Sequence, residues 1–171
     1  MANEQSNALT RKLYTEYKLD RSDVFSSKQG FQIVTRTGIE KIQYKENITV
    51  SFEVITAQRD YVLIKATATK DGRSIETIGS ATKGSFEMVP KKKKNGETYK
   101  SLTLINGSTD SWYVAEIAEK RALSRAILKV TGLYEYGCFG EDENQEDFKP
   151  QTEKNKASAE DLVDDIISGR K

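Results

Sequence analysis

The chain is 171 residues long, 36% hydrophobic and 31% charged, with no histidine and a single cysteine, Cys138. This composition predicts one globular domain, excludes an internal disulfide and a thiolate zinc site, and removes the commonest general base. The sequence contains neither a GxxxxGK[ST] phosphate loop nor a GxGxxG motif. We therefore expect a protein that is not an enzyme and that uses no metal or cofactor.

The two parts of the chain carry opposite charge. Residues 1–140 hold 22 Lys and Arg against 16 Asp and Glu, whereas residues 141–171 hold 5 against 10. A basic body is typical of proteins with an anionic partner, although a solubilising tail on an ordinary domain gives the same pattern. No apolar signal region begins the chain, and no stretch approaches the roughly 18 apolar residues of a membrane span. With its one cysteine, the chain is expected to be cytoplasmic, with no membrane partner.

The first 45 residues predict little regular structure. Residues 1–10 are polar, and we expect them to be frayed. Residues 11–19 predict one or two helical turns, and residues 20–30 a connector. The apolar run at 31–34 predicts a short strand, and apolar residues at helical spacing predict a short helix over 38–45.

Apolar and polar side chains then alternate over residues 48–54, as in a half-buried strand. Its buried side is expected to carry Ile48, Val50, Phe52 and Val54.

Residues 61–84 predict a β-hairpin, because Asp71-Gly72 is a strong two-residue turn signal between two apolar runs. Folding about this turn pairs Lys70 with Arg73, Ala68 with Ile75, Ala66 with Thr77, Ile64 with Gly79 and Val62 with Ala81. One face of the hairpin then carries small side chains, which let another element approach closely.

A second hairpin is predicted over 85–105, with Asn95-Gly96 at its turn. Four lysines precede that turn: Lys91, Lys92, Lys93 and Lys94. They have two interpretations. They form a solvated tip that discourages aggregation, or an arm that contacts phosphates.

The longest helix is predicted over 110–132, with Asp110 or Ser111 as its N-cap and Gly132 just beyond its end. Alanines recur at every fourth position along it, and this side is the natural candidate to pack against the small-residue hairpin 61–84. The predicted fold is therefore α+β, with an antiparallel twisted sheet (a β-β-β-α core) packed on one long helix.

A stripe of cations follows one side of this helix, because Arg121, Arg125 and Lys129 also recur at every fourth position. Like charges at that spacing cost an isolated helix about 0.2–0.5 kcal/mol per pair. Either an external anion or nearby carboxylates such as Glu116 and Glu119 must offset this cost.

After the helix the chain becomes acidic. We expect residues 1–140 to form the domain, 141–157 a disordered linker, and 158–171 an acidic amphipathic helix. The last segment is either a docking motif for a protein partner or a helix that folds back onto the domain.

The hairpin and helix together resemble the single-strand annealing superfamily, which includes the Rad-fifty-two recombination protein and phage relatives. The resemblance covers roughly residues 48–138. It rests on a strand, a KDG turn, a second strand with spaced glycines, and a KRAL helix, here Lys70-Asp71-Gly72, Gly79, Gly84 and Lys120-Arg121-Ala122-Leu123. It implies a domain that assembles into rings or filaments and binds single-stranded DNA in a basic groove, in a bacterial or phage-infected host cell.

By this resemblance Lys120 and Arg121 face the DNA backbone. The cation stripe adds Arg125 and Lys129, and Lys83 and the four hairpin lysines are further candidates. Tyr44, Tyr61 and Trp112 are aromatic residues that either stack on bases or belong to the core.

The function expected from these features is annealing of complementary DNA strands in recombination and repair. Two alternatives remain: protection of single-stranded DNA without annealing, and a protein-interaction module whose cations meet a partner's carboxylates. The expected partners are single-stranded DNA, further copies of the chain, and a replication or recombination protein bound by the acidic tail.

Overall fold

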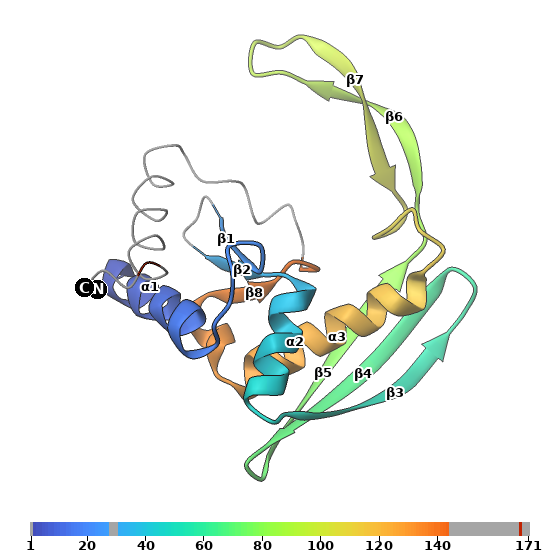
Figure 1. Ribbon diagram of the computed structural model, residues 1–171. Coiled ribbons are helices and arrows are strands. Elements are labelled where there is room, and N and C mark those ends of the chain that lie inside the picture. Colours follow the sequence, from blue (N-terminus) through green and yellow to red (C-terminus); the bar gives the residue numbers. More distant parts are fainter. Residues whose placement is uncertain (1, 28–30, 144–167, 169–171) are drawn as a thin grey trace.

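A computed structural model describes residues 2–27, 31–143 and 168. It is an α+β fold in which a long helix lies against an antiparallel sheet and a two-stranded hairpin projects from the body (Figure 1). The helices and helical turns are α1 (Ala2–Arg11), the π-helical turn η1 (Lys12–Glu16), α2 (Arg36–Lys45), α3 (Val114–Val130) and the 3₁₀ turn η2 (Leu133–Tyr136). The strands are β1 (Val24–Ser26), β2 (Gln32–Val34), β3 (Thr49–Ala57), β4 (Tyr61–Lys70), β5 (Arg73–Thr82), β6 (Ser85–Lys92), β7 (Thr98–Ile105) and β8 (Cys138–Gly140).

The principal sheet has the order β3-β4-β5. Its β4–β5 hairpin has the register predicted from the sequence, from Lys70 opposite Arg73 to Val62 opposite Ala81. Asp71 and Gly72 both have positive φ angles, of 49° and 78°, as the tight turn requires. The predicted antiparallel hairpin is therefore confirmed.

Helix α3 lies across β4 and β5 (Figure 1), and its alanine side meets the small residues of the hairpin. Ala118, Ala122 and Ala126 are fully buried. The closest approach is at Gly79 of β5, where an added Cβ would meet the backbone of Ala118 and Ala122. A hydrogen bond also holds α3 against β5, because buried Thr77 donates its hydroxyl hydrogen to the Ala122 carbonyl at 2.7 Å.

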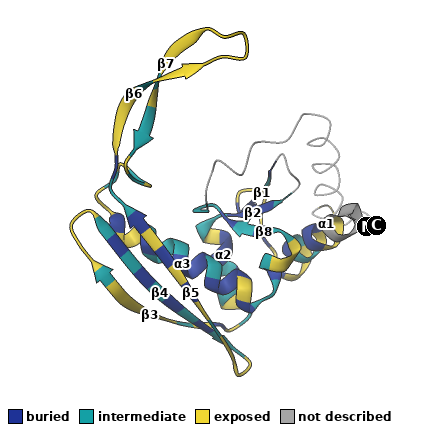
Figure 2. Ribbon diagram, turned by 180° about the vertical axis from the view of Figure 1, so that it is seen from behind, coloured by how far each residue is buried: buried dark blue, intermediate teal, exposed yellow. Residues whose placement is uncertain are grey.

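Strand β3 confirms the predicted strand, but the prediction of its buried face is only partly right. Ile48 is buried and Val50 is half-buried, whereas Phe52 and Val54 are 45% and 60% exposed. The reason is that α3 covers β4 and β5 and leaves most of β3 uncovered (Figure 2). A β-bulge between Val54 and Thr56 also exposes Ile55.

The N-terminal part is more structured than the sequence predicted. Residues 2–11 form helix α1 where a frayed end was expected, and Leu9, Leu13 and Tyr17 are buried in the core. A small sheet of order β1-β2-β8, with β2 and β8 parallel, was also not predicted. Its strands are three residues each, too short to show a period in the sequence. The strand near 31–34 and helix α2, capped by Thr35, are confirmed.

Helix α3 is 17 residues long and ends as predicted, with Gly132 in the left-handed conformation at φ 74°. Its beginning differs from the prediction. The N-cap is Tyr113 rather than Asp110 or Ser111, because the Ser111 hydroxyl instead accepts a hydrogen bond from the Tyr113 amide in the preceding loop.

The β6–β7 hairpin confirms the second predicted hairpin and projects away from the rest of the chain (Figure 1). Lys91 and Lys92 lie at the end of β6, and Lys93 and Lys94 lie in the turn with Asn95-Gly96. At its base Gly84 and Gly107 lie in backbone contact.

The body extends slightly beyond the predicted boundary at residue 140. The Glu141 amide donates to the Val34 carbonyl at 3.0 Å, and residues 141–143 lie against the body. The remainder of the predicted linker, and the predicted acidic helix except Ser168, lie outside the described residues. Within the described residues, no helix is long and apolar enough to cross a membrane.

Candidate nucleic-acid interface

The corner where the projecting hairpin joins the sheet brings together three segments distant in sequence. They are the β3–β4 turn, the end of β5 and the loop that leads into α3. The Lys83 amide donates to the Asp60 carbonyl, and Ser108 and Thr109 amides donate to the Thr82 carbonyl. A parallel bridge joins Lys83 to Thr109. This backbone network fixes the positions of the side chains that follow.

Trp112 lies at this corner with two cations near its ring. The Lys83 Nζ and the Arg59 guanidinium carbon are each 5.1 Å from its ring centroid, within the range of a cation–π contact. Lys83 also donates to the Gly84 carbonyl at 2.7 Å. Both positive charges therefore lie beside the ring.

The aromatic rings at this corner are unusually accessible. Trp112 is 62% exposed and its neighbour Tyr113 is 70% exposed. Aromatic side chains of this size normally contribute to the core, so two consecutive exposed ones make this corner a candidate contact surface. We call the set Arg59, Lys83, Trp112 and Tyr113 the corner cluster.

The hairpin lysines are connected to the corner cluster only by strand β6, which begins at the corner and carries them at its far end. Lys91 to Lys94 are exposed at the far end of β6, whose first residue follows Gly84 directly. Lys93 bonds Glu97 at 3.2 Å, while Glu97 is also bonded by Asn95. The hairpin projects from the body (Figure 1), and these lysines give its far end a basic character.

The arginine stripe of α3 has partners within the chain. Arg121 donates to the Ser80 carbonyl at 2.7 Å and to the Asp142 carbonyl at 3.1 Å. Arg125 donates to the Ile78 carbonyl at 2.8 Å and pairs with the Glu143 carboxylate at 3.1 Å. Glu119, which was expected to offset the charge of this stripe, instead pairs with Arg36 at 3.3 Å. These contacts offset the like-charge cost without an external anion, and DNA contact by Arg121 and Arg125 stays a prediction.

Replacing Arg125 with alanine is expected to lower the free energy of unfolding by about 1–3 kcal/mol, because the part-buried Glu143 and the Ile78 carbonyl lose their donor. Urea denaturation followed by circular dichroism measures this. Lys129→Ala, at an exposed position of the same stripe, is the matched control and should change stability by less than about 0.5 kcal/mol. Equal stability of the Arg125 variant and the wild type would contradict a structural role for this side chain.

The other predicted cations on α3 have looser surroundings. The Lys129 Nζ lies 5.3 Å from the centroid of the Tyr134 ring. Lys120 is half-buried near Asp142, whose pKa is raised by burial and lowered by the charges of Lys120 and Arg121, with burial the larger cause. Neither lysine lies in the corner cluster.

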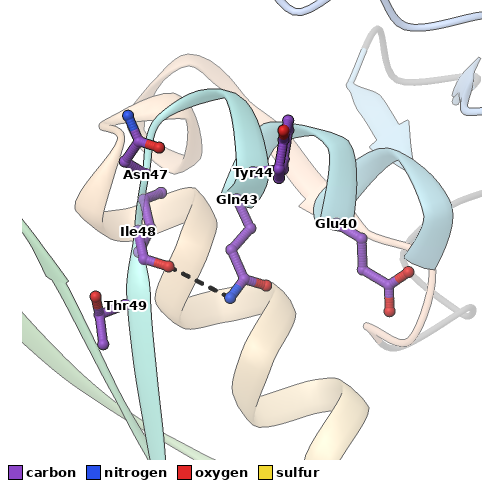
Figure 3. A pocket seen from close by; sticks show the side chains of 6 residues that line it. All are labelled: Glu40, Gln43, Tyr44, Asn47, Ile48 and Thr49. Atoms are coloured by element: carbon purple, nitrogen blue, oxygen red, sulfur yellow. Dashed lines mark hydrogen bonds between the residues drawn. The ribbon is translucent and has the colours of Figure 1, made fainter.

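The predicted aromatic residues are separated in space. Tyr61 opens β4 opposite Thr82 and is half-buried at the edge of the corner. Tyr44 is 87% exposed on α2. It lines an open depression of about 540 Å³ with Glu40, Gln43, Asn47, Ile48 and Thr49 (Figure 3). Polar side chains dominate that depression, and Gln43 is bonded to the Ile48 carbonyl at 3.4 Å.

Two members of the corner cluster, Arg59 and Tyr113, were not among the residues predicted from the sequence. Arg59 stands in a short turn whose neighbours give no periodic signal. Tyr113 directly follows Trp112, and this pair of adjacent aromatic residues just before a helix is the feature of the sequence that could have identified it. These two residues come close together because the β3–β4 turn and the loop before α3 both lie at the same end of the β4–β5 hairpin.

The described residues contain no group of three or more His, Cys, Asp or Glu side chains that could hold a metal ion. Burial raises the pKa of the Cys138 thiol to about 12, so this cysteine is not a nucleophile at neutral pH. No family model, curated protein or solved structure matches the chain.

Proposed function

We propose that this protein binds single-stranded DNA and promotes the annealing of complementary strands. The observation that carries the proposal is the corner cluster, in which an exposed tryptophan is flanked by two cations at 5.1 Å. Sites that bind single strands without sequence preference combine these two components, a basic surface for the backbone and aromatic faces for the bases.

Each component has a separate role. Arg59 and Lys83 neutralise phosphates and release counterions, which makes the affinity depend on salt. Trp112 and Tyr113 stack on bases, a contact open to any base because each has a π face. Stacking requires an unpaired base, so the aromatics favour single strands over a duplex.

The projecting hairpin supports the same proposal. Its lysines lie outward from the corner cluster, so a strand held at the corner would meet further positive charge along the hairpin. The resemblance of residues 48–138 to the single-strand annealing superfamily supports the further step from binding to annealing. No nucleotide hydrolysis is required for that step, since pairing itself is favourable once two strands are held with accessible bases.

A fluorescence titration tests the binding. Trp112 is the only tryptophan of the chain, so its emission reports on the corner cluster directly. Adding an unlabelled oligothymidylate is expected to quench the emission. The logarithm of the binding constant should fall linearly with the logarithm of salt concentration, with a slope near −0.7 for each phosphate neutralised. Absence of quenching, or binding that does not respond to salt, would contradict the proposal.

Annealing is tested with the same preparation by following the pairing of two complementary oligonucleotides. A rate above that of the oligonucleotides alone supports annealing. Tight binding with a slowed rate would instead favour strand protection, the alternative expected from the sequence.

A further inference from the structure

One face of the β6–β7 hairpin is apolar and uncovered. Phe86, Met88 and Leu102 are 49%, 57% and 61% exposed, and Leu104 extends the same face, because Phe86 lies opposite Leu104 and Met88 opposite Leu102. The other face carries Glu87 and Lys91 among other residues. None of the residues 85–105, all of which the structure describes, is buried. We call the four apolar side chains the hairpin strip.

An isolated two-stranded hairpin is marginally stable in water and gains stability from a third strand or a packed face. Of its two edges, that of β6 contains Pro90, which has no amide hydrogen to donate. Strand β7 contains no proline, so none of its residues lacks an amide hydrogen to donate. A further strand therefore pairs better with β7 than with β6.

The principal sheet has one occupied edge and one open edge. On β5, the carbonyls of Ile78 and Ser80 are bonded by Arg125 and Arg121. Strand β3, at the opposite edge, pairs with β4 alone within the described part of the chain. The uncovered side chains Phe52 and Val54 lie along this open edge, with Ile55 exposed at the bulge.

We propose that β7 of one copy of this chain pairs with the open edge of β3 of a second copy. The contact extends the sheet to the order β5-β4-β3 followed by β7 and β6 of the neighbour. It places the hairpin strip beside Phe52 and Val54, so that apolar side chains share one face. The opposite face then carries Ser51 and Glu53 beside the mixed face of the hairpin, which holds Glu87 and Lys91 together with Val89, Tyr99 and Ile105.

The sizes of the two surfaces agree with this assignment. Strands β3 and β7 are 9 and 8 residues long. Large side chains that are about half exposed present roughly 100 Å² each, so the exposed apolar residues of the two surfaces present on the order of 600 Å². A specific interface requires roughly 1,000 Å² in total, so the backbone edges of the two paired strands must supply the remainder.

The contact joins two different surfaces, so each added copy leaves one hairpin and one β3 edge free. Such a head-to-tail contact continues into a ring or a filament instead of stopping at a dimer. It involves no residue of the corner cluster, and it stands or fails independently of DNA binding.

Two variants of the full chain test the proposal, one for each surface. Leu102→Glu places a charge in the hairpin strip, and Phe52→Glu places one on the open edge of β3. Ser85→Glu adds the same charge on the opposite face of the hairpin, on the neighbouring strand β6, and Ser51→Glu adds it on the opposite face of β3. Both serines are exposed, and the two variants serve as matched controls. Sedimentation velocity without DNA measures the mass of each protein and of mixtures, and circular dichroism verifies folding.

We expect the wild type and both controls to form assemblies larger than a dimer, and each test variant alone to be monomeric. An equimolar mixture of the two test variants should form dimers, because the intact hairpin of one fits the intact edge of the other and growth then stops. Such dimers also show that both variants are folded. A monomeric wild type, test variants that still assemble, or a mixture that remains monomeric would overturn the proposal.

Discussion

Replacing Trp112 with alanine is expected to weaken binding of a single-stranded oligonucleotide by roughly 5- to 150-fold, since stacking on an aromatic side chain contributes about 1–3 kcal/mol per base. The ring is 62% exposed, so its removal leaves no cavity, and the loss of each exposed cation–π contact should lower the free energy of unfolding by no more than about 1 kcal/mol. Fluorescence anisotropy of a labelled oligonucleotide measures the affinity, because the variant has no tryptophan.

The salt dependence separates the ring from its flanking cations. The Trp112 variant should keep the wild-type slope against salt, because the ring carries no charge. Arg59→Ala should make the slope shallower by about 0.7 if the guanidinium neutralises one phosphate. Tyr44→Ala removes an even more exposed aromatic, from α2, and is the control, with unchanged affinity. Wild-type affinity in the Trp112 variant would locate the binding surface elsewhere.

Replacing Gly79 with alanine is expected to lower the free energy of unfolding by at least about 1–3 kcal/mol, the usual cost of forcing extra atoms into a packed core. The added Cβ would meet the Ala118 carbonyl oxygen and the Ala122 amide nitrogen, which are backbone atoms of α3. No rotamer change can relieve that clash, so the helix must move away from the sheet. Urea denaturation measures the loss.

The sign of this effect is diagnostic. At a strand position with free space, alanine in place of glycine stabilises by about 0.4–1 kcal/mol, because it restricts the unfolded chain. Ser80→Ala, at the adjacent exposed position, is the control and should stay within about 0.5 kcal/mol of the wild type. A more stable Gly79 variant would show that α3 does not lie as close to β5 as the structure has it.

The sequence predicted those parts of the fold that local chemistry determines. The Asp71-Gly72 turn fixes the register of a ten-residue pairing, because both positions accept positive φ angles and every later pair follows from the turn. Small residues at Gly79 and Ala122 likewise indicated which helix side meets which strand face. The short strands β1 and β8 could not be predicted, since three residues carry no period.

The candidate site was harder to predict, because its members converge only through the tertiary arrangement. Alternation along β3 identified an apolar face but not whether a helix covers it, and Phe52 proved exposed. The sequence predicted that the like charges of the α3 cation stripe destabilise the helix unless a partner offsets them. Its partners could not be foreseen, because they are the carbonyls of Ile78 and Ser80 and the segment after residue 140.

The projecting hairpin also gives the chain two levels of resistance to unfolding. Residues 85–105 contribute no buried side chain, and their strands are joined to the body at the Gly84–Gly107 contact. In an unassembled copy of the chain, the pairing of β6 with β7 can therefore open while α3 remains on the sheet, as a separate cooperative unit of low local stability. Its backbone amides would exchange with solvent on a much shorter timescale than those of β4 and β5. A single melting temperature for the chain consequently describes the body and not the hairpin.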